Sequence, residues 1–139
     1  MKIKMNTSKS PVIKTQVVGS YPVPGWLQAL PSAPNLRDAM LTIIKTQELA
    51  GLDIISDGEL SRFDPNHPET NGMIEYFIRP LDGITQSIGL SEREAYQQAQ
   101  GMQFRNRPPG MVIGPIGEGN LDLKSSWESI KPLAQGNLM

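Results

Sequence analysis

The chain contains no cysteine, and this absence removes two classes of site. Without thiols there can be no disulfide framework, and no thiolate can ligate a metal ion. Long hydrophobic runs are also absent. No segment approaches the length of a membrane span, and no apolar run of signal-peptide length follows the charged start at Met1–Met5. We therefore expect a cytoplasmic protein.

Neither sign of charge is in excess, because 13 Lys and Arg residues face 14 Asp and Glu residues, for a net charge of −1. This balance argues against a nucleic-acid or membrane-surface role that is driven by bulk electrostatics. The length of 139 residues fits one modest domain. The 13 glycines and 12 prolines indicate many turns and irregular loops.

Two short stretches have the composition of buried strands that end at a glycine. The first is Val12–Val18, which is followed by Gly19-Ser20, and the second is Leu52–Ser56, which is followed by Asp57-Gly58-Glu59. A helix between them completes a strand–helix–strand unit, which is typical of a parallel α/β enzyme. Such sheets carry their chemistry at the carboxyl edge, so we predict that Ser20 and Glu59 lie near one another.

The helix between the strands is predicted over residues 36–50. Its apolar residues recur at i, i+3 and i+4 and mark one buried stripe. Asn35 suits the N-cap, and Gly51 stands where a left-handed residue is expected after the helix. A further helical turn is expected at Trp26–Leu30, before a proline-rich break at Pro31–Pro34.

The remainder of the chain predicts shorter elements. We expect a loop over 61–70, helices over 72–78, 91–100 and 125–134, a hairpin from strands near 81–84 and 109–116, and a strand beginning at 137–139. Ser91-Glu-Arg-Glu has the form of a capping box. Two parallel strands and a hairpin do not close a barrel. The chain is therefore either a fragment or completes its sheet with another chain.

Glu59 and Ser20 are the leading functional candidates. A carboxylate at Glu59 can bind a substrate ammonium group or act as a general base. The alternative is a loop acid that caps a helix or pairs with Arg62. Ser20 can offer its hydroxyl and N–H to a carboxylate or phosphate, or it can be an ordinary turn serine. No Gly-x-Ser-x-Gly motif surrounds it, which argues against a nucleophile elbow.

Three further motifs have simpler interpretations. His67, the only histidine, lies among acidic residues but without a recognised ligand spacing, which favours a solvated loop. The glycine-rich run at 114–119 lacks a Lys-Ser/Thr pair, so we interpret it as a hairpin turn and not a phosphate cradle. The basic pair Arg105 and Arg107 is either a solvated loop or an anion contact.

Four segments follow one another in an informative order: Val17-Val-Gly-Ser-Tyr-Pro-Val-Pro24, Gln47-Glu-Leu-Ala-Gly-Leu-Asp-Ile-Ile-Ser-Asp-Gly-Glu59, Gly72-Met-Ile-Glu-Tyr-Phe77 and Pro108-Pro-Gly-Met-Val-Ile-Gly114. Together they resemble the catalytic barrel of cobalamin-independent methionine synthase, in the superfamily that includes uroporphyrinogen decarboxylase. The resemblance implies an α/β fold, the N-terminal portion of a (β/α)₈ TIM barrel that is incomplete in this chain. Residues 1–14 would be a flexible tail and residues 15–139 the partial barrel domain.

The family transfers a methyl group from a methyltetrahydrofolate polyglutamate to homocysteine, whose thiol is activated by zinc. The resemblance implies that Val18, Gly19 and Ser20 cradle the amino-acid part of homocysteine and that Glu59 contacts its amino group. Arg105 corresponds loosely to a folate-contacting Arg-Cys pair, although the cysteine is missing.

The family's zinc ligands are a His, two Cys and a Glu on later barrel strands, and this chain contains no counterpart of them. We therefore predict that the 139 residues alone do not catalyse methyl transfer. One rival is a relative that transfers another group to another thiol, as epoxyalkane:coenzyme M transferases do. A second rival is a non-catalytic product that forms a homo-oligomer or assembles with a complementing chain, since unpaired strand edges invite association.

Overall fold

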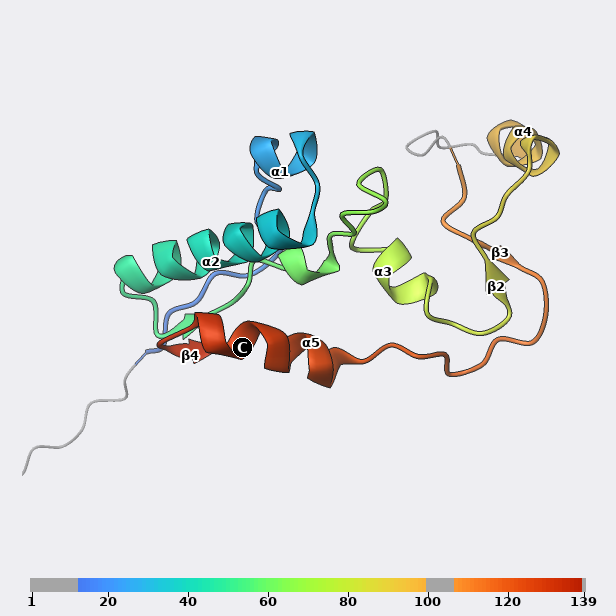
Figure 1. Ribbon diagram of the computed structural model, residues 1–139. Helices are drawn as coiled ribbons and strands as arrows, with labels where there is room; N and C mark the ends of the chain where they lie inside the picture. The colour runs from blue at the N-terminus through green and yellow to red at the C-terminus, as the bar shows by residue number, and fades with distance from the viewer. Residues whose placement is uncertain (1–12, 100–106, 139) are drawn as a thin grey trace, which may run out of the picture.

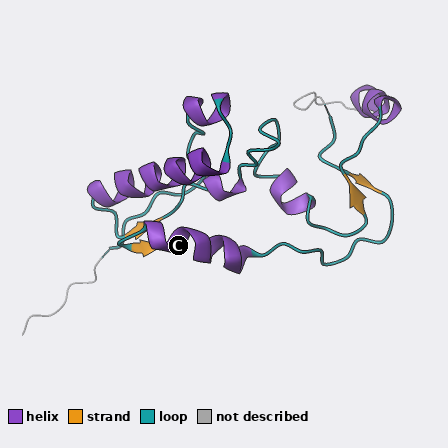
Figure 2. Cartoon of the chain, in the orientation of Figure 1, coloured by secondary structure: helices purple, strands orange, loops and turns teal. Residues whose placement is uncertain are grey.

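The structure, a computed structural model, describes residues 13–99 and 107–138 (Figure 1). The chain is mixed α/β, with short strands and a larger share of helix (Figure 2). In chain order the elements are α1 (Gly25–Ala29), α2 (Ala33–Leu49), β1 (Ile54–Ile55), the 3₁₀ turn η1 (Leu60–Arg62), α3 (Glu75–Ile78), β2 (Ile84–Thr85), α4 (Leu90–Ala99), β3 (Met111–Val112), α5 (Leu123–Ile130), η2 (Lys131–Leu133) and β4 (Asn137–Leu138).

β1 lies between two parallel neighbours. β4 pairs with it in the register Ile54 to Asn137 and Ile55 to Leu138, and Gln16 forms a parallel bridge to Ile54 from the other side. The strand predicted at Leu52–Ser56 is confirmed only at Ile54–Ile55, and the strand start predicted at 137–139 is confirmed at Asn137–Leu138, with Met139 outside the described residues. The strand expected over Val12–Val18 was predicted too long, because only Gln16 finds a ladder partner. Val12 lies outside the described residues.

Both helical connections pack on the same face of these strands. Ile44 of α2, Ile55 of β1 and Ile130 of α5 belong to one buried cluster, together with Leu133 of η2. The three parallel segments also follow one another in space in their order along the chain. The sheet is therefore wound in one direction, with its helices on one side.

α2 begins three residues earlier than predicted. Ser32, not Asn35, is the N-cap, and its hydroxyl accepts the N–H of Asn35 at 3.3 Å. Pro34 is tolerated because the first turn of a helix needs no N–H donor inside the helix. Gly51 follows the helix at φ 74°, as predicted for the residue after the C-cap.

The antiparallel pair of β2 and β3 confirms the predicted hairpin, with Ile84 opposite Val112. The glycine-rich run at 114–119 was predicted as a hairpin turn, which is wrong, because the segment that follows it leads into α5 and not into a strand. The run lies beside residues 80–83, since the N–H of Asn120 donates to the carbonyl of Pro80 at 3.0 Å. A side chain at Gly119 would approach that carbonyl oxygen to 1.9 Å, so glycine permits the close approach of the two backbones.

The helices of the second half differ from prediction at their ends. α4 begins at Leu90, and the Ser91 hydroxyl donates to Glu92, so the predicted capping box is wrong. α5 ends at Ile130 and continues only as the 3₁₀ turn η2, because Pro132 lacks the N–H that a longer α-helix needs. Within the described ranges, no helix combines the length and the apolar character needed to span a membrane.

Candidate functional site

Ser20 and Glu59 meet at the carboxyl ends of neighbouring parallel segments. The Ser20 hydroxyl donates a hydrogen bond to the Glu59 carboxylate. Beside this contact, the N–H of Tyr21, which follows Ser20, donates to the carbonyl of Gly58, which precedes Glu59, at 2.9 Å. The predicted proximity of the two strand ends is therefore confirmed.

Gly58 makes this meeting possible. Its φ of 68° lies in the left-handed region. A Cβ atom at this position would lie 2.6 Å from the Cβ of Tyr21 and 3.2 Å from the Cγ2 of Ile43 in α2. Any larger residue would separate the two strand ends and move Glu59 away from Ser20.

The loop that carries Glu59 is fixed by side chains that bind its backbone. The buried amide of Gln47 accepts the N–H of Ser56 at 3.0 Å and donates to its carbonyl at 2.8 Å. The Ser56 hydroxyl in turn accepts the N–H of Gly58 at 3.2 Å. The Asp57 carboxylate accepts the N–H of Glu59 at 3.0 Å. This network holds Glu59 at φ 60°, a conformation that costs a non-glycine residue about 1–3 kcal/mol.

The Glu59 carboxylate also pairs with Arg62, whose Nη1 lies 2.9 Å from Oε2. Both side chains are about a quarter exposed. The same Nη1 donates to the Sδ of Met73 at 3.1 Å, and the guanidinium lies 5.1 Å from the ring centre of Phe77. Glu59 therefore pairs with Arg62 and at the same time accepts the hydrogen bond from Ser20.

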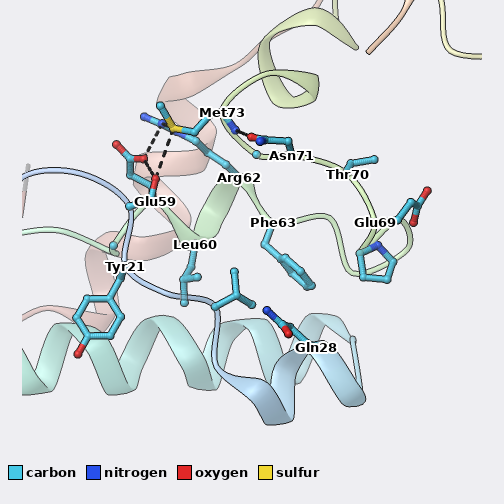
Figure 3. Close-up of a pocket in the computed structure, with 15 residues that line it drawn as sticks. Tyr21, Gln28, Glu59, Leu60, Arg62, Phe63, Glu69, Thr70, Asn71 and Met73 are labelled. Atoms are coloured by element: carbon cyan, nitrogen blue, oxygen red, sulfur yellow. Dashed lines mark hydrogen bonds and ion pairs between the residues drawn. The ribbon is translucent and has the colours of Figure 1, made fainter. Parts of the chain in front are cut away.

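These residues line a pocket of about 470 Å³. That volume falls within the range of about 300–1,000 Å³ that small-molecule sites occupy. Figure 3 shows Glu59, Arg62 and Met73 grouped together, with Glu69 and Thr70 on the opposite side. The lining residues are Ser20, Tyr21, Val23, Gln28, Gly58, Glu59, Leu60, Arg62, Phe63 and Pro68–Met73.

Glu69 adds a second carboxylate to the pocket wall. Its own backbone N–H, followed by the nearby charges of His67 and Arg107, lowers its pKa below the ordinary range of a glutamate. Glu69 is therefore ionised at neutral pH, and the pocket wall carries two carboxylates, Glu59 and Glu69, and one guanidinium, Arg62.

The residues described here do not fit a zinc ion. His67 lies on an exposed loop, as predicted, with its Nδ1 3.4 Å from Glu69. In the described ranges, no three His, Cys, Asp or Glu side chains converge in a way that could hold a metal. Arg105, the residue that loosely matches a folate contact, lies outside the described residues.

Sequence reasoning missed Gln47 and Met73. Gln47 was detectable, because it continues the buried stripe of α2 after Ile43 and Ile44, and a polar residue on such a stripe needs a partner. Met73 comes from the segment before α3, and its contact with Arg62 depends on how the loop folds back. No local pattern predicts such a contact.

Comparison with known proteins supports the motif-based resemblance. The chain is 34% identical to the methionine synthase of Pyrococcus furiosus over 86 residues, and 32% and 33% identical to those of Thermococcus kodakarensis and Sulfurisphaera tokodaii. The chain is similar to methionine synthases over about half its length. Each match covers 53% of this chain but only 23% of the relative.

The other comparisons add no match. No family model matches the chain, and no solved structure matches it significantly. The likeness to methionine synthases therefore rests on the matched sequence segment, and the chain spans about a quarter of the length of the curated relatives it matches.

Proposed function

We propose that this chain forms the part of a methionine synthase-type site that holds the amino-acid end of a thiol substrate such as homocysteine. The observation that carries the proposal is the contact of Ser20 with Glu59 in one pocket at the carboxyl ends of parallel segments. Glu59 would bind the substrate ammonium group, while Ser20, Gly19 and Val18 would hold the rest of the amino-acid end. The similarity to methionine synthases supports this assignment.

The proposed fold is the N-terminal portion of a (β/α)₈ barrel. A barrel of this kind has strands in sequential order, with helices on the outer face only. The winding of the Gln16 segment, β1 and β4, with α2 and α5 on one face, supports that proposal. A doubly wound sheet would instead reverse its strand order and carry helices on both faces.

The 139 residues would not complete methyl transfer by themselves. Zinc is the family's means of activating the thiol. The sequence has no cysteine, and the described residues offer no metal cluster, so no step through zinc can be assigned to them. The metal ligands and the methyl donor site for methyltetrahydrofolate polyglutamate would have to come from polypeptide outside these 139 residues, and a homo-oligomer alone would add no cysteine.

Calorimetric titration of the 139-residue chain with L-homocysteine tests the proposal. We expect weak but saturable binding that Glu59→Gln reduces by about tenfold or more, because hydrogen bonds between charged groups are the strong ones. Asp38→Asn, an exposed change on α2, is the matched control. Tighter binding of 2-mercaptoethanesulfonate than of homocysteine would favour the coenzyme M rival, and turnover of a methyl donor by the chain alone would contradict the predicted inactivity.

A further inference from the structure

Arg62 stands out among the residues that line the pocket. It is the only Lys, Arg or His among the described lining residues. Its guanidinium is held beside the Glu59 carboxylate, at the point where the amino-acid end of the ligand is proposed to bind. The proposed function as stated above assigns no role to this cation.

We propose that Arg62 receives the carboxylate of an α-amino acid ligand, by exchanging its internal partner Glu59 for the ligand. The inference rests on the proposed function. Glu59 and Arg62 present one negative and one positive charge 2.9 Å apart. An α-amino acid carries the complementary pair, an ammonium group and a carboxylate on one carbon. When it binds, its ammonium group replaces Arg62 at Glu59, and its carboxylate replaces Glu59 at Arg62.

The exchange turns one ion pair into two. The internal pair is partly exposed, and pairs of this kind contribute little stability, so opening it is a small obstacle. The Ser20 hydroxyl, which donates to Glu59 in the free protein, becomes available to the incoming carboxylate. Both new contacts form between charged groups and carry more binding energy than neutral hydrogen bonds do.

The surroundings of Arg62 fit this role. Its guanidinium is supported by the Phe77 ring at 5.1 Å and by the Met73 sulfur at 3.1 Å from Nη1. Neither neighbour is an anion that would compete with a ligand carboxylate. The contacts to Glu59 and Met73 both use Nη1, and in residues 13–99 and 107–138 no acceptor contacts Nη2 or Nε. The planar fork that binds carboxylates in two places is therefore available.

The test compares three ligands that differ only at the amino-acid end. L-Methionine carries both charges, 3-(methylthio)propylamine lacks the carboxylate, and 4-(methylthio)butanoate lacks the ammonium group. Calorimetry on the 139-residue chain would measure each affinity for the wild type, for Arg62→Gln and for Arg62→Lys. Arg37→Gln, on the exposed face of α2, serves as the matched control.

We expect Arg62→Gln to weaken L-methionine and the butanoate by about tenfold or more, as expected for loss of a charge-assisted contact. The amine should bind as well as before or better, because Glu59 no longer has an internal partner. Arg62→Lys should recover part of the loss, since it keeps the charge but not the fork. Circular dichroism would verify that each variant is folded.

The two possible failures are distinguishable. If Arg62→Gln weakens the amine and L-methionine by the same factor, Arg62 only orders Glu59, and this inference is wrong while the proposed function stands. If neither L-methionine nor L-homocysteine binds the wild-type chain at millimolar concentration, the proposed function itself fails and the inference fails with it.

Discussion

Two regions of the molecule differ in what holds them together. The core region, residues 13–62 and 123–138, contains all eight buried hydrophobic side chains of the described structure. The arm, residues 63–122, has none among its described residues, and Glu75 is its one buried side chain there. Figure 1 shows the arm, with β2, β3 and α4, reaching away from the α2 and α5 helices.

The pocket lies where these regions meet, and each supplies a different kind of wall. Ser20, Glu59 and Arg62 come from the core region, where buried side chains and backbone hydrogen bonds fix their positions. Glu69 and Met73 come from the arm, and the Met73 side chain is 55% exposed. The side of the pocket that carries Ser20, Glu59 and Arg62 is therefore anchored in the core region, while the side that carries Glu69 and Met73 has no buried hydrophobic side chain of the arm behind it among the described residues.

The described part of the arm leaves several apolar side chains exposed. They include Val112, Ile113, Ile116 and Leu121. Large exposed apolar patches are typical of interaction sites, so sedimentation of the chain alone would test whether the arm supports self-association.

The largest expected effect separates the regions by stability. Ile55 is 1% exposed and packs between α2 and α5, so Ile55→Ala should lower the free energy of unfolding by about 2–5 kcal/mol. Val112→Ala, at 60% exposure in the arm, should change it by about 0.5 kcal/mol or less. Urea denaturation measures both. Ile55→Val, expected to cost about 0.5–1.5 kcal/mol, keeps the test valid if the alanine variant does not fold.

Equal losses from the Ile55 and Val112 substitutions would contradict the division into a core region and an arm. That outcome would mean that the arm packs against a surface in solution as firmly as β1 packs against α2 and α5. The matched pair is informative because both residues are β-branched strand residues, so strand propensity changes in the same direction in each case.

The second prediction concerns the amide that joins α2 to the site loop. Gln47→Met removes both hydrogen bonds to Ser56 and leaves its N–H and carbonyl buried without a partner, which costs about 1–3 kcal/mol. The amide resonances of Gly58 and Glu59 should shift as the loop relaxes. Arg37→Met, on the exposed side of the same helix, should leave stability and resonances nearly unchanged. Unchanged stability in Gln47→Met would show that the hydrogen bonds within the loop, from Ser56 and Asp57, are sufficient to keep its conformation.

The part of the fold with strong local signals was predictable from sequence. The stripe through Ile43 and Ile44, the glycine at 51 and the β-branched run at Ile54–Ile55 all agree with the structure, because each depends on residues near in sequence. The meeting of Ser20 and Glu59 was also predictable, because parallel strands share a carboxyl edge.

The failures share a different physical origin. The prolines at 31 and 34 indicate a break before the helix and so point to Asn35 as the N-cap, but proline is tolerated in the first turn of a helix, and the N-cap is Ser32. The glycines of the run at 114–119, without a Lys-Ser/Thr pair, indicate a hairpin turn. Their reason lies in Pro80, far away in sequence, whose carbonyl needs the space that a side chain would fill. Contacts of this kind depend on tertiary structure and leave no local pattern.

The smallest expected effect is a dependence of the outer parallel segments on pH. Asp53 accepts the N–H and hydroxyl of Thr15 at 2.8 and 2.9 Å, and these bonds lower its pKa. Glu48 pairs with Lys45 and accepts the N–H groups of Gln135 and Gly136 before β4, and its pKa is lowered in the same way. Each carboxylate thereby fastens one neighbour of β1.

Both pKa values lie below those of the unfolded chain, which are about 3.9 for Asp and 4.3 for Glu. The stabilisation is therefore complete above pH values of about 4 to 5 and is lost as the pH falls through the folded-state pKa. As the pH falls, the protection of amide N–H groups against exchange, relative to the intrinsic rate at each pH, should decrease first at Ile54, whose N–H donates to Thr15, and at residues 135–136. The amides of α2 should stay protected. Asp53→Asn should reduce the pH dependence of exchange at Ile54 only. Glu48→Gln should reduce it only near β4, at residues 135–136. If protection instead decreased uniformly over α2 and both outer segments, global unfolding would explain the effect of low pH, and local detachment of the Gln16 segment and β4 from β1 would not.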